Sequence, residues 1–413
     1  MARGQAKAAA APRQRINFRE LPRRIGYAIS HVYGGQSSLF TLIVWVSFIL
    51  VGFGLLMVLS SSAIDSIRVN NGNATYMFQK QVIFATVGFV LLTAAAVFPL
   101  AWYERVAPVV FLAMMGLQLL AVTIGRSVNG NREWLPLPGG FSLQPAEFLK
   151  LGMVVMVARF LYQRHEYADH PRYYTWPAFA VPAFVIISVM LGSDLGTSLV
   201  IGSVAFGLVW LSGAPGQDLR LPLVIGVIGV IAAVNFTGSR TGRISAWLHT
   251  DYSNDTGTYA WQTVHAAWAL ANANIIGTGL GQSSLKWSWI PEVENDYIFA
   301  IIGEELGIIG ALGTIAMFLW LCYLIMKVGL RAGSLFGRFI CLGIGLWFLL
   351  QSMVNISVVL GVLPVLGVPL PLISAGGSSL IAGMAAIGVV LAVERQKHLE
   401  LDGGSRKPKL VRV

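Results

Sequence analysis

Apolar residues in this chain occur in long runs that are separated by short polar connectors. A run of roughly membrane-spanning length with few charges predicts a transmembrane helix. Ten such runs can be marked, at 39–60, 81–100, 107–125, 146–162, 175–192, 196–213, 221–238, 297–326, 339–361 and 376–393. The pattern therefore predicts an all-α polytopic membrane protein with ten transmembrane helices.

Lys and Arg are distributed unequally between alternate connectors, and this asymmetry sets the expected orientation. One set of connectors and the two tails hold most of the basic residues. The positive-inside rule therefore places both termini in the cytoplasm. Residues 1–38 and 395–413 are then basic cytoplasmic tails, the first expected to be disordered, on either side of a single transmembrane domain at 39–394. The other connectors hold fewer, among them Arg68, Arg126, Arg132, Arg240, Arg243 and Lys286.

The longest connector, 239–296, joins the seventh and eighth helices and falls on the extracytoplasmic side. It is rich in Trp and Tyr, and its part from about 262 to 276 has apolar residues at helical spacing. We expect an amphipathic helix at the outer membrane interface, where Trp and Tyr settle at headgroup level. For any single aromatic side chain, a place in a simple membrane-surface belt is the alternative.

Composition agrees with a membrane protein and argues against other classes. Of the 413 residues, 55% are hydrophobic and only 12% are charged, whereas soluble domains carry about 25% charged residues. The net charge of +10 comes mostly from the tails and connectors, and no basic-aromatic patch for nucleic acid stands out. Cys322 and Cys341 both lie in apolar runs, which indicates neither a disulfide framework nor a metal site.

An acidic stretch meets the head of the eighth apolar run. Residues 291–296 read Pro-Glu-Val-Glu-Asn-Asp, and the apolar run begins at Tyr297. Asp296 is in the right place to be the N-cap of the helix, because Asp before an apolar helix is a common start signal. It is equally placed to hold a carboxylate at the outer membrane surface for chemistry. These residues alone leave both roles open.

Polar residues inside the apolar runs are a second signal, because they are costly in hydrocarbon and usually mark function or a helix contact. Glu147 and Lys150, three residues apart, share a helix face and can form an ion pair. That pair could also be purely structural. Asp194 lies at the outer turn between the fifth and sixth helices, and Gln351 and Asn355 share a face of the ninth.

Residues 363–379 are almost wholly apolar, yet three prolines and three glycines prevent a regular helix there. Non-helical backbone near membrane depth is tolerated only where protein buries it or where it lines a cavity. We expect a re-entrant or tightly packed loop beside an outer cavity. The small residues at 376–379 would allow close helix approach.

Several of these stretches resemble motifs of the SEDS family, the polytopic membrane proteins of bacterial cell division and elongation. PEVENDYIFAIIGEELG at 291–307 is similar to the family signature PEAHTDFIFAIIGEELG, and 362–379 resembles the LPxxGxPLPFxSxGGSS motif. QPAEFLK at 144–150, SDLGTSLV at 193–200 and NGNREW at 129–134 resemble three further motifs. They occur in the family's order over the whole apolar region, and the extended basic N-terminal tail favours the cell-division branch.

The resemblance implies a peptidoglycan glycosyltransferase that polymerises lipid II at the outer face of the bacterial cytoplasmic membrane during septal cell-wall synthesis. It implies an inverting-type transfer with undecaprenyl pyrophosphate as the leaving group. It also implies a class B penicillin-binding protein, a transpeptidase, and other membrane proteins of the division machinery as partners, and concentration at the division septum.

By motif, the resemblance assigns catalysis to Asp296. Cationic side chains would stabilise the departing pyrophosphate, and a divalent cation, Mg²⁺ or Mn²⁺, could share that task. The chain departs from the family pattern at 192–193, at 294–295 and at Ala375. The candidate substrate-binding residues are Lys286, Arg243, Glu147, Lys150 and Asp194.

Two other functions are compatible with the same helices. A transporter that moves the lipid-linked precursor between leaflets would use buried charges such as Glu147 and Lys150 along its path. A non-enzymatic scaffold of the division machinery would suit the basic tails. The concentration of acids toward the outer face favours the enzyme over both.

Overall fold

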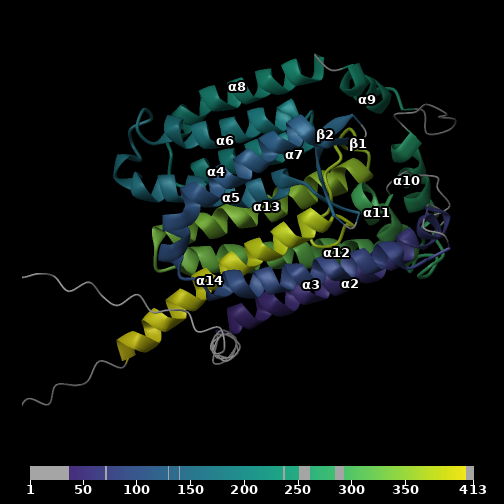
Figure 1. Cartoon of the computed structure of the whole chain (residues 1–413), viewed down its shortest axis with the longest axis horizontal. Helices are drawn as coiled ribbons and strands as arrows, with labels where there is room; N and C mark the ends of the chain where they lie inside the picture. The colour runs from purple at the N-terminus through teal and green to yellow at the C-terminus, as the bar shows by residue number, and fades with distance from the viewer. Residues whose placement is uncertain are drawn as a thin grey trace, which may run out of the picture.

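The computed structural model describes residues 37–69, 72–128, 130–138, 140–235, 238–250, 261–283 and 293–405. Most of the predicted N-terminal tail and the end of the C-terminal tail lie outside these ranges. Lys286 and a large part of the outer connector do as well. In Figure 1 the long helices lie side by side in one bundle, and the C-terminal helix leaves it at one end.

Each of the ten predicted apolar runs coincides with one long helix. Among the described residues, seven of these helices are long and apolar enough to cross a membrane, and α6 and α7 are apolar but shorter. The all-α polytopic membrane class is therefore confirmed, whereas the number of spans stays a prediction. The helices are α2 (Ser38–Val69), α3 (Tyr76–Val97), α4 (Leu100–Ile124), α5 (Pro145–Gln163), α6 (Thr175–Leu191), α7 (Leu195–Leu211), α8 (Gly216–Asn235), α12 (Ile298–Arg331), α13 (Leu335–Val359) and α14 (Gly377–Ser405).

Local sequence signals set several helix starts. Asp194 is the N-cap of α7, and its Oδ1 accepts a hydrogen bond from the Thr197 amide at 2.9 Å. Ser334 caps α13 in the same way, through the Gly337 amide at 3.1 Å. Pro145 opens α5, where a missing N–H leaves no helical hydrogen bond unmade.

The end of the bundle away from the C-terminal helix end carries a small sheet that the hydropathy pattern did not predict (Figure 1). The three strands are antiparallel in the order β1-β2-β3. They were missed because each is short, from 3 to 7 residues, and such runs carry little periodicity. The strands are β1 (Arg126–Val128), β2 (Asn131–Leu137) and β3 (Phe141–Leu143).

Three short helices lie in the described parts of the long outer connector. They are α9 (Gly238–Leu248), α10 (Trp261–Asn272) and α11 (Val293–Asp296), and a 3₁₀ turn, η2 (His165–Tyr167), joins α5 to α6. The predicted helix at about 262–276 is confirmed as α10, although it ends at Asn272. Its place at a membrane interface stays a prediction.

The centre of the bundle is formed by α13 and α14, whereas α8 lies at its edge (Figure 1). In the most apolar window of α14, 89% of the residues are buried, compared with 6% in α8. Gly388 of α14 lies against the main chain of Leu92 in α3, so that no side chain separates the two helices there. Small residues permit such close approach between membrane helices.

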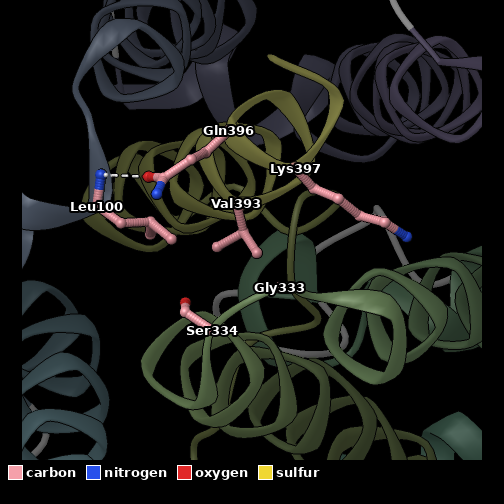
Figure 2. Close-up of a pocket in the computed structure, with 6 residues that line it drawn as sticks. All are labelled: Leu100, Gly333, Ser334, Val393, Gln396 and Lys397. Carbon is pink, nitrogen blue, oxygen red and sulfur yellow. Dashed lines mark hydrogen bonds between the residues drawn. The ribbon is translucent and has the colours of Figure 1, made fainter. Parts of the chain in front are cut away.

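At the end of the bundle opposite the sheet, α14 is tied to the start of α4. The Gln396 side-chain oxygen accepts a hydrogen bond from the Leu100 amide at 3.1 Å (Figure 2), which satisfies one of the free first-turn amides of α4. The described residues that line the small crevice beside this bond include no carboxylate. It is lined by Leu100, Gly333, Ser334, Val393, Gln396 and Lys397.

The orientation can be tested with single added cysteines, because the native Cys322 and Cys341 are both buried. Ile276, beyond α10, is 78% exposed, and Tyr167, in η2, is 48% exposed. We expect a membrane-impermeant maleimide to label Ile276→Cys in intact spheroplasts and Tyr167→Cys only after permeabilisation, as the distribution of Lys and Arg predicts. Labelling in the opposite order would reverse the orientation.

Candidate active site

Asp296 is the last residue of α11 and directly precedes Tyr297 and α12. Its main-chain carbonyl accepts a hydrogen bond from Nδ2 of Asn355 at 2.8 Å. Its Oδ2 lies 3.6 Å from where a Cβ on Gly367 would be, and the side chain is half-buried. The N-cap position of α12 is occupied by Tyr297, so the structure does not place Asp296 at the cap of this helix.

The apolar loop between α13 and α14 passes beside this carboxylate. Its residues Val368, Leu370, Leu372 and Ile373 are almost fully buried, which confirms the predicted tightly packed loop. Side chains hold its main chain. Asn355 also donates to the Val368 carbonyl at 2.8 Å, so a single amide joins the loop to Asp296.

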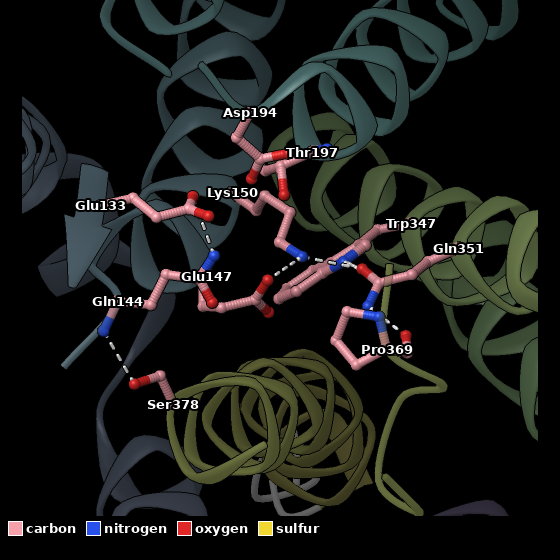
Figure 3. A network of polar contacts seen from close by, with 10 residues as sticks. All are labelled: Glu133, Gln144, Glu147, Lys150, Asp194, Thr197, Trp347, Gln351, Pro369 and Ser378. Atoms are coloured by element: carbon pink, nitrogen blue, oxygen red, sulfur yellow. Dashed lines mark hydrogen bonds and ion pairs between the residues drawn. The ribbon is translucent and has the colours of Figure 1, made fainter. Parts of the chain in front are cut away.

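The first residue pair of the site, Glu147 and Lys150, lies in α5 and is buried. The Lys150 amine is 2.7 Å from Glu147 Oε1, donates to Gln351 Oε1 at 2.8 Å and lies 5.1 Å from the centre of the Trp347 ring. Gln351 in turn donates to the Pro369 carbonyl at 2.9 Å. The predicted ion pair is therefore confirmed, and Figure 3 shows it connected through α13 to the loop.

A second polar group joins the sheet to the start of α7. Glu133 in β2 makes a side-chain hydrogen bond with Asp194 and accepts one from Gln144 at 3.0 Å. Burial of the Glu133 carboxyl, together with the charge of Asp194, raises the pKa of Glu133 to about 10. Glu133 is therefore protonated near neutral pH, and the two acids can share one hydrogen bond without mutual repulsion.

Two arginines of α9 point toward these groups. The Arg240 guanidinium donates to the Ser193 carbonyl at 2.5 Å and is attracted by the Asp194 charge. Arg243 acts electrostatically on Arg240 and on the Tyr297 hydroxyl. The short helix thus places positive charge near Asp194 and near Tyr297, the residue that follows Asp296.

The structure brings most of the predicted site residues to one end of the bundle. Asp296, Glu147 and Lys150 are linked to the same loop through Asn355 and Gln351. Asp194 is linked to this loop by α7, because a Cβ on Gly196 would overlap the Leu366 carbonyl. Lys286 lies outside the described residues.

Several contributing residues were not identified as site residues from the sequence. Gln351 and Asn355 gave a signal in their i, i+4 spacing, but nothing indicated their partners. Glu133 is the one acid in the connector between the third and fourth runs, which could have marked it. Gln144 lies in the QPAEFLK motif and Arg240 lies among the basic residues of the long connector, but neither was assigned to the site.

The described residues contain no group of three or more His, Cys, Asp or Glu side chains that could hold a metal ion. Mg²⁺ commonly binds through one or two carboxylates together with water and substrate phosphates, and such binding needs no larger cluster. The cation requirement stays a prediction.

The ion pair of α5 can be tested with a double-mutant cycle. Glu147→Ala leaves a buried ammonium without its carboxylate, a change that typically costs about 3–5 kcal/mol. We expect it to lower the thermal stability of the detergent-solubilised protein more than the combined change Glu147→Gln with Lys150→Met. The single changes Glu147→Gln and Lys150→Met complete the cycle with the combined variant, and additive effects of these two would show that the side chains do not stabilise each other.

The acid pair predicts a pH dependence. The unfolded chain releases the Glu133 proton above about pH 4.5, the ordinary value, whereas the folded protein keeps it, so this group destabilises the fold progressively as the pH rises. Glu133→Gln cannot ionise and still donates to Asp194. Its melting temperature should match that of the wild type near pH 5 and exceed it increasingly toward pH 9.

The matched control is Glu166→Gln, which changes an exposed acid of η2 and should show no such widening. If the difference between Glu133→Gln and the wild type stayed constant across the pH range, Glu133 would not be a retained proton donor. Melting curves at pH 5, 7 and 9 are sufficient for the comparison.

The chain is similar to several known proteins. A family model described as "Cell cycle protein", covering FtsW, RodA and SpoVE, matches residues 40–399. A probable peptidoglycan glycosyltransferase FtsW from a Thioalkalivibrio species is 34% identical over 87% of this chain and 90% of its own length. The corresponding Mycobacterium tuberculosis protein is 34% identical over 88% of this chain and 69% of its own length.

Solved structures show the same fold. A chain of a peptidoglycan synthase complex, described as coordinating polymerization and crosslinking, has a TM-score of 0.69 and 26% identity over 89% of this chain and 99% of its own. The rod shape determining protein RodA of Thermus thermophilus has a TM-score of 0.64 and 24% identity over 89% of this chain and 99% of its own. From the shared motifs, the helical fold and these matches, the chain belongs to the FtsW/RodA/SpoVE family of polytopic membrane proteins.

Proposed function

We propose that this protein is a peptidoglycan glycosyltransferase that polymerises lipid II at the outer face of the bacterial cytoplasmic membrane during cell division. Relatives that are 34% identical over most of the chain carry the name peptidoglycan glycosyltransferase FtsW. The observation that carries the proposal is the setting of Asp296. Its main chain is held by Asn355, while its side chain remains half-buried at the outer end of the bundle.

The reaction joins the C4 hydroxyl of an acceptor sugar to the anomeric carbon of a donor. The new C–O bond forms as the bond from the anomeric carbon to the pyrophosphate oxygen breaks, and a single displacement of this kind inverts the anomeric centre. Asp296 takes the proton of the attacking hydroxyl as general base, an effect typically worth about 10²–10⁴ in rate. The lipid pyrophosphate leaves with the electron pair.

Negative charge develops on the departing pyrophosphate and needs cationic stabilisation. Among the described residues we assign this role to Arg243, because its charge interacts with Tyr297, the residue that follows Asp296. Lys286 is assigned the same role from its motif position. Lys150 is bonded to Glu147 and Gln351, and Gln351 holds the loop beside Asp296. Asp194 caps α7, which packs against the same loop at Gly196.

The partner proposed for this chain is a class B penicillin-binding protein, which would crosslink the strands that this protein makes. A similar chain was solved in a complex described as coordinating polymerization and crosslinking, and this supports the pairing. Other division proteins of the membrane and concentration at the septum follow from the division role of the relatives' name.

The decisive test replaces the proposed base. Asp296→Asn keeps the size and the main-chain bond to Asn355 but cannot accept the hydroxyl proton. We expect expression and melting temperature near wild type and a loss of lipid II polymerisation of at least about 10²-fold. Purified protein with its penicillin-binding partner is incubated with lipid II, and glycan chains are resolved on a gel.

The matched control is Glu294→Gln, the same carboxylate-to-amide change two residues earlier, which should keep substantial activity. Near-normal polymerisation by folded Asp296→Asn would remove Asp296 from the mechanism. Wild-type protein that exchanges lipid II between leaflets without forming polymer would instead identify a transporter.

A further inference from the structure

The long helix that follows Asp296 is broken. At Gly307 the backbone has φ 67° and ψ −164°, which is not helical, so α12 consists of two pieces that meet at this residue. The first piece, 298–306, begins two residues after Asp296. The second, 308–331, is the longer part. Such a break leaves main-chain carbonyls of the first piece and amides of the second without helical partners.

The segment that follows α10 provides those partners. The Thr278 amide donates to the Glu304 carbonyl at 2.9 Å, and the Gly279 amide donates to the Glu305 carbonyl at 3.0 Å. The Ile309 amide, in the second piece, donates to the Ile275 carbonyl at 3.4 Å. Residues 275–279 of the outer connector therefore cap both pieces of α12 at the break.

Two glycines make this crossing possible. Gly277 has φ +83°, and a Cβ there would lie 2.5 Å from the carbonyl carbon of Glu305 and from the amide nitrogen of Gly307. A Cβ on Gly307 would in turn overlap the main chain of Asn274, Ile275 and Gly277. Each glycine thus occupies a left-handed conformation in which the other chain leaves no room for a side chain.

Side chains reinforce the same crossing. Ser283 Oγ donates to Glu304 Oε2 at 2.5 Å, and Ser60 of α2 donates to Glu305 Oε2 at 2.7 Å. Thr278 Oγ1 donates to the Glu304 carbonyl at 3.1 Å. Both glutamates are almost fully buried. The end of the first piece is therefore fixed to the connector and to α2.

The geometry makes this anchor matter for catalysis. From Asp296 to Gly307 the chain rises about 16 Å if it is helical throughout. A rotation of about 10° at the break would therefore move the Asp296 end by roughly 3 Å. A displacement of about 1 Å in a catalytic group can cost about 10²-fold in rate.

We propose that Gly277 and Gly307 are positioning residues for the glycosyl transfer. Their crossing sets the direction of the first piece of α12 and thereby holds the Asp296 carboxylate within reach of the acceptor hydroxyl. This inference rests on the function proposed above. The outer connector then has two roles. It carries positive charge near the site, and it fixes the position of α12, the helix that follows Asp296.

The test compares Gly277→Ala with Gly72→Ala. Gly72, in the turn between α2 and α3, has φ +88° and nothing within 4 Å of its Cβ position. Alanine at this position is therefore strained by the positive φ but does not clash with another segment. We expect Gly277→Ala to lower kcat for lipid II polymerisation at least about tenfold, with KM within about twofold of wild type. Gly72→Ala should keep both constants within about twofold.

A second pair covers the case in which Gly277→Ala does not fold. Thr278→Val removes only the hydroxyl bond to the Glu304 carbonyl, and Thr278→Ser keeps it. We expect kcat to fall about two- to fivefold in the first and to return toward wild type in the second, with KM unchanged in both.

The outcomes separate this inference from the proposed function. Equal losses in Gly277→Ala and Gly72→Ala, a rise in KM at constant kcat, or no difference between the two Thr278 variants would overturn the positioning role. Absence of polymerisation by the wild-type protein would instead overturn the proposed function.

Discussion

The end of the bundle that carries the small sheet depends on how the loop between α13 and α14 satisfies its peptide groups. The loop is apolar, buried and non-helical, so its carbonyls and amides cannot rely on water or on a helical ladder. Gln351 and Asn355, one turn apart on α13, bond successive parts of it through the Pro369 and Val368 carbonyls. Ser374 accepts from the Leu370 amide at 2.9 Å. An unsatisfied group here would cost about 1–3 kcal/mol.

Other outer elements are placed by contact with this loop. The Ala375 amide donates to the Glu294 carbonyl at 3.0 Å and so connects the loop to α11. Trp247 of α9 donates to the Gly361 carbonyl at 2.8 Å. Gly196 at the start of α7 lies against Leu366 without an intervening side chain. The helices α7, α9 and α11 therefore all contact the main chain of this one loop.

The charges of the site are arranged so that few of them are buried alone. Lys150 is enclosed by its carboxylate partner, an amide oxygen and an aromatic ring, and Glu133 is neutral because its proton is retained beside Asp194. Asp296 differs from these, because it is only half-buried. A base must be reachable by substrate, and the partial exposure of this carboxylate is compatible with the role proposed for it.

The sequence by itself determined the membrane class and the place of each long helix. The backbone hydrogen bonds of a membrane helix form within the segment itself, so the length and apolarity of a run are enough to predict the helix. The ion pair of Glu147 and Lys150 followed from a spacing of three residues for the same reason, and the packed loop followed from its prolines and glycines. Asp296 was identified from its position before an apolar run and from the family motif around it, and its role stays a proposal.

Tertiary structure alone decided which distant residues support that carboxylate. Asn355 is 59 residues from Asp296, Glu133 and Asp194 come from different connectors, and Gly277 meets Gly307 only where a connector crosses a helix break. Each of these contacts depends on how helices pack against one another, and no periodicity in the chain records that packing. The short strands and the break in α12 belong to the same class, because neighbouring segments supply the hydrogen bonds that make them stable.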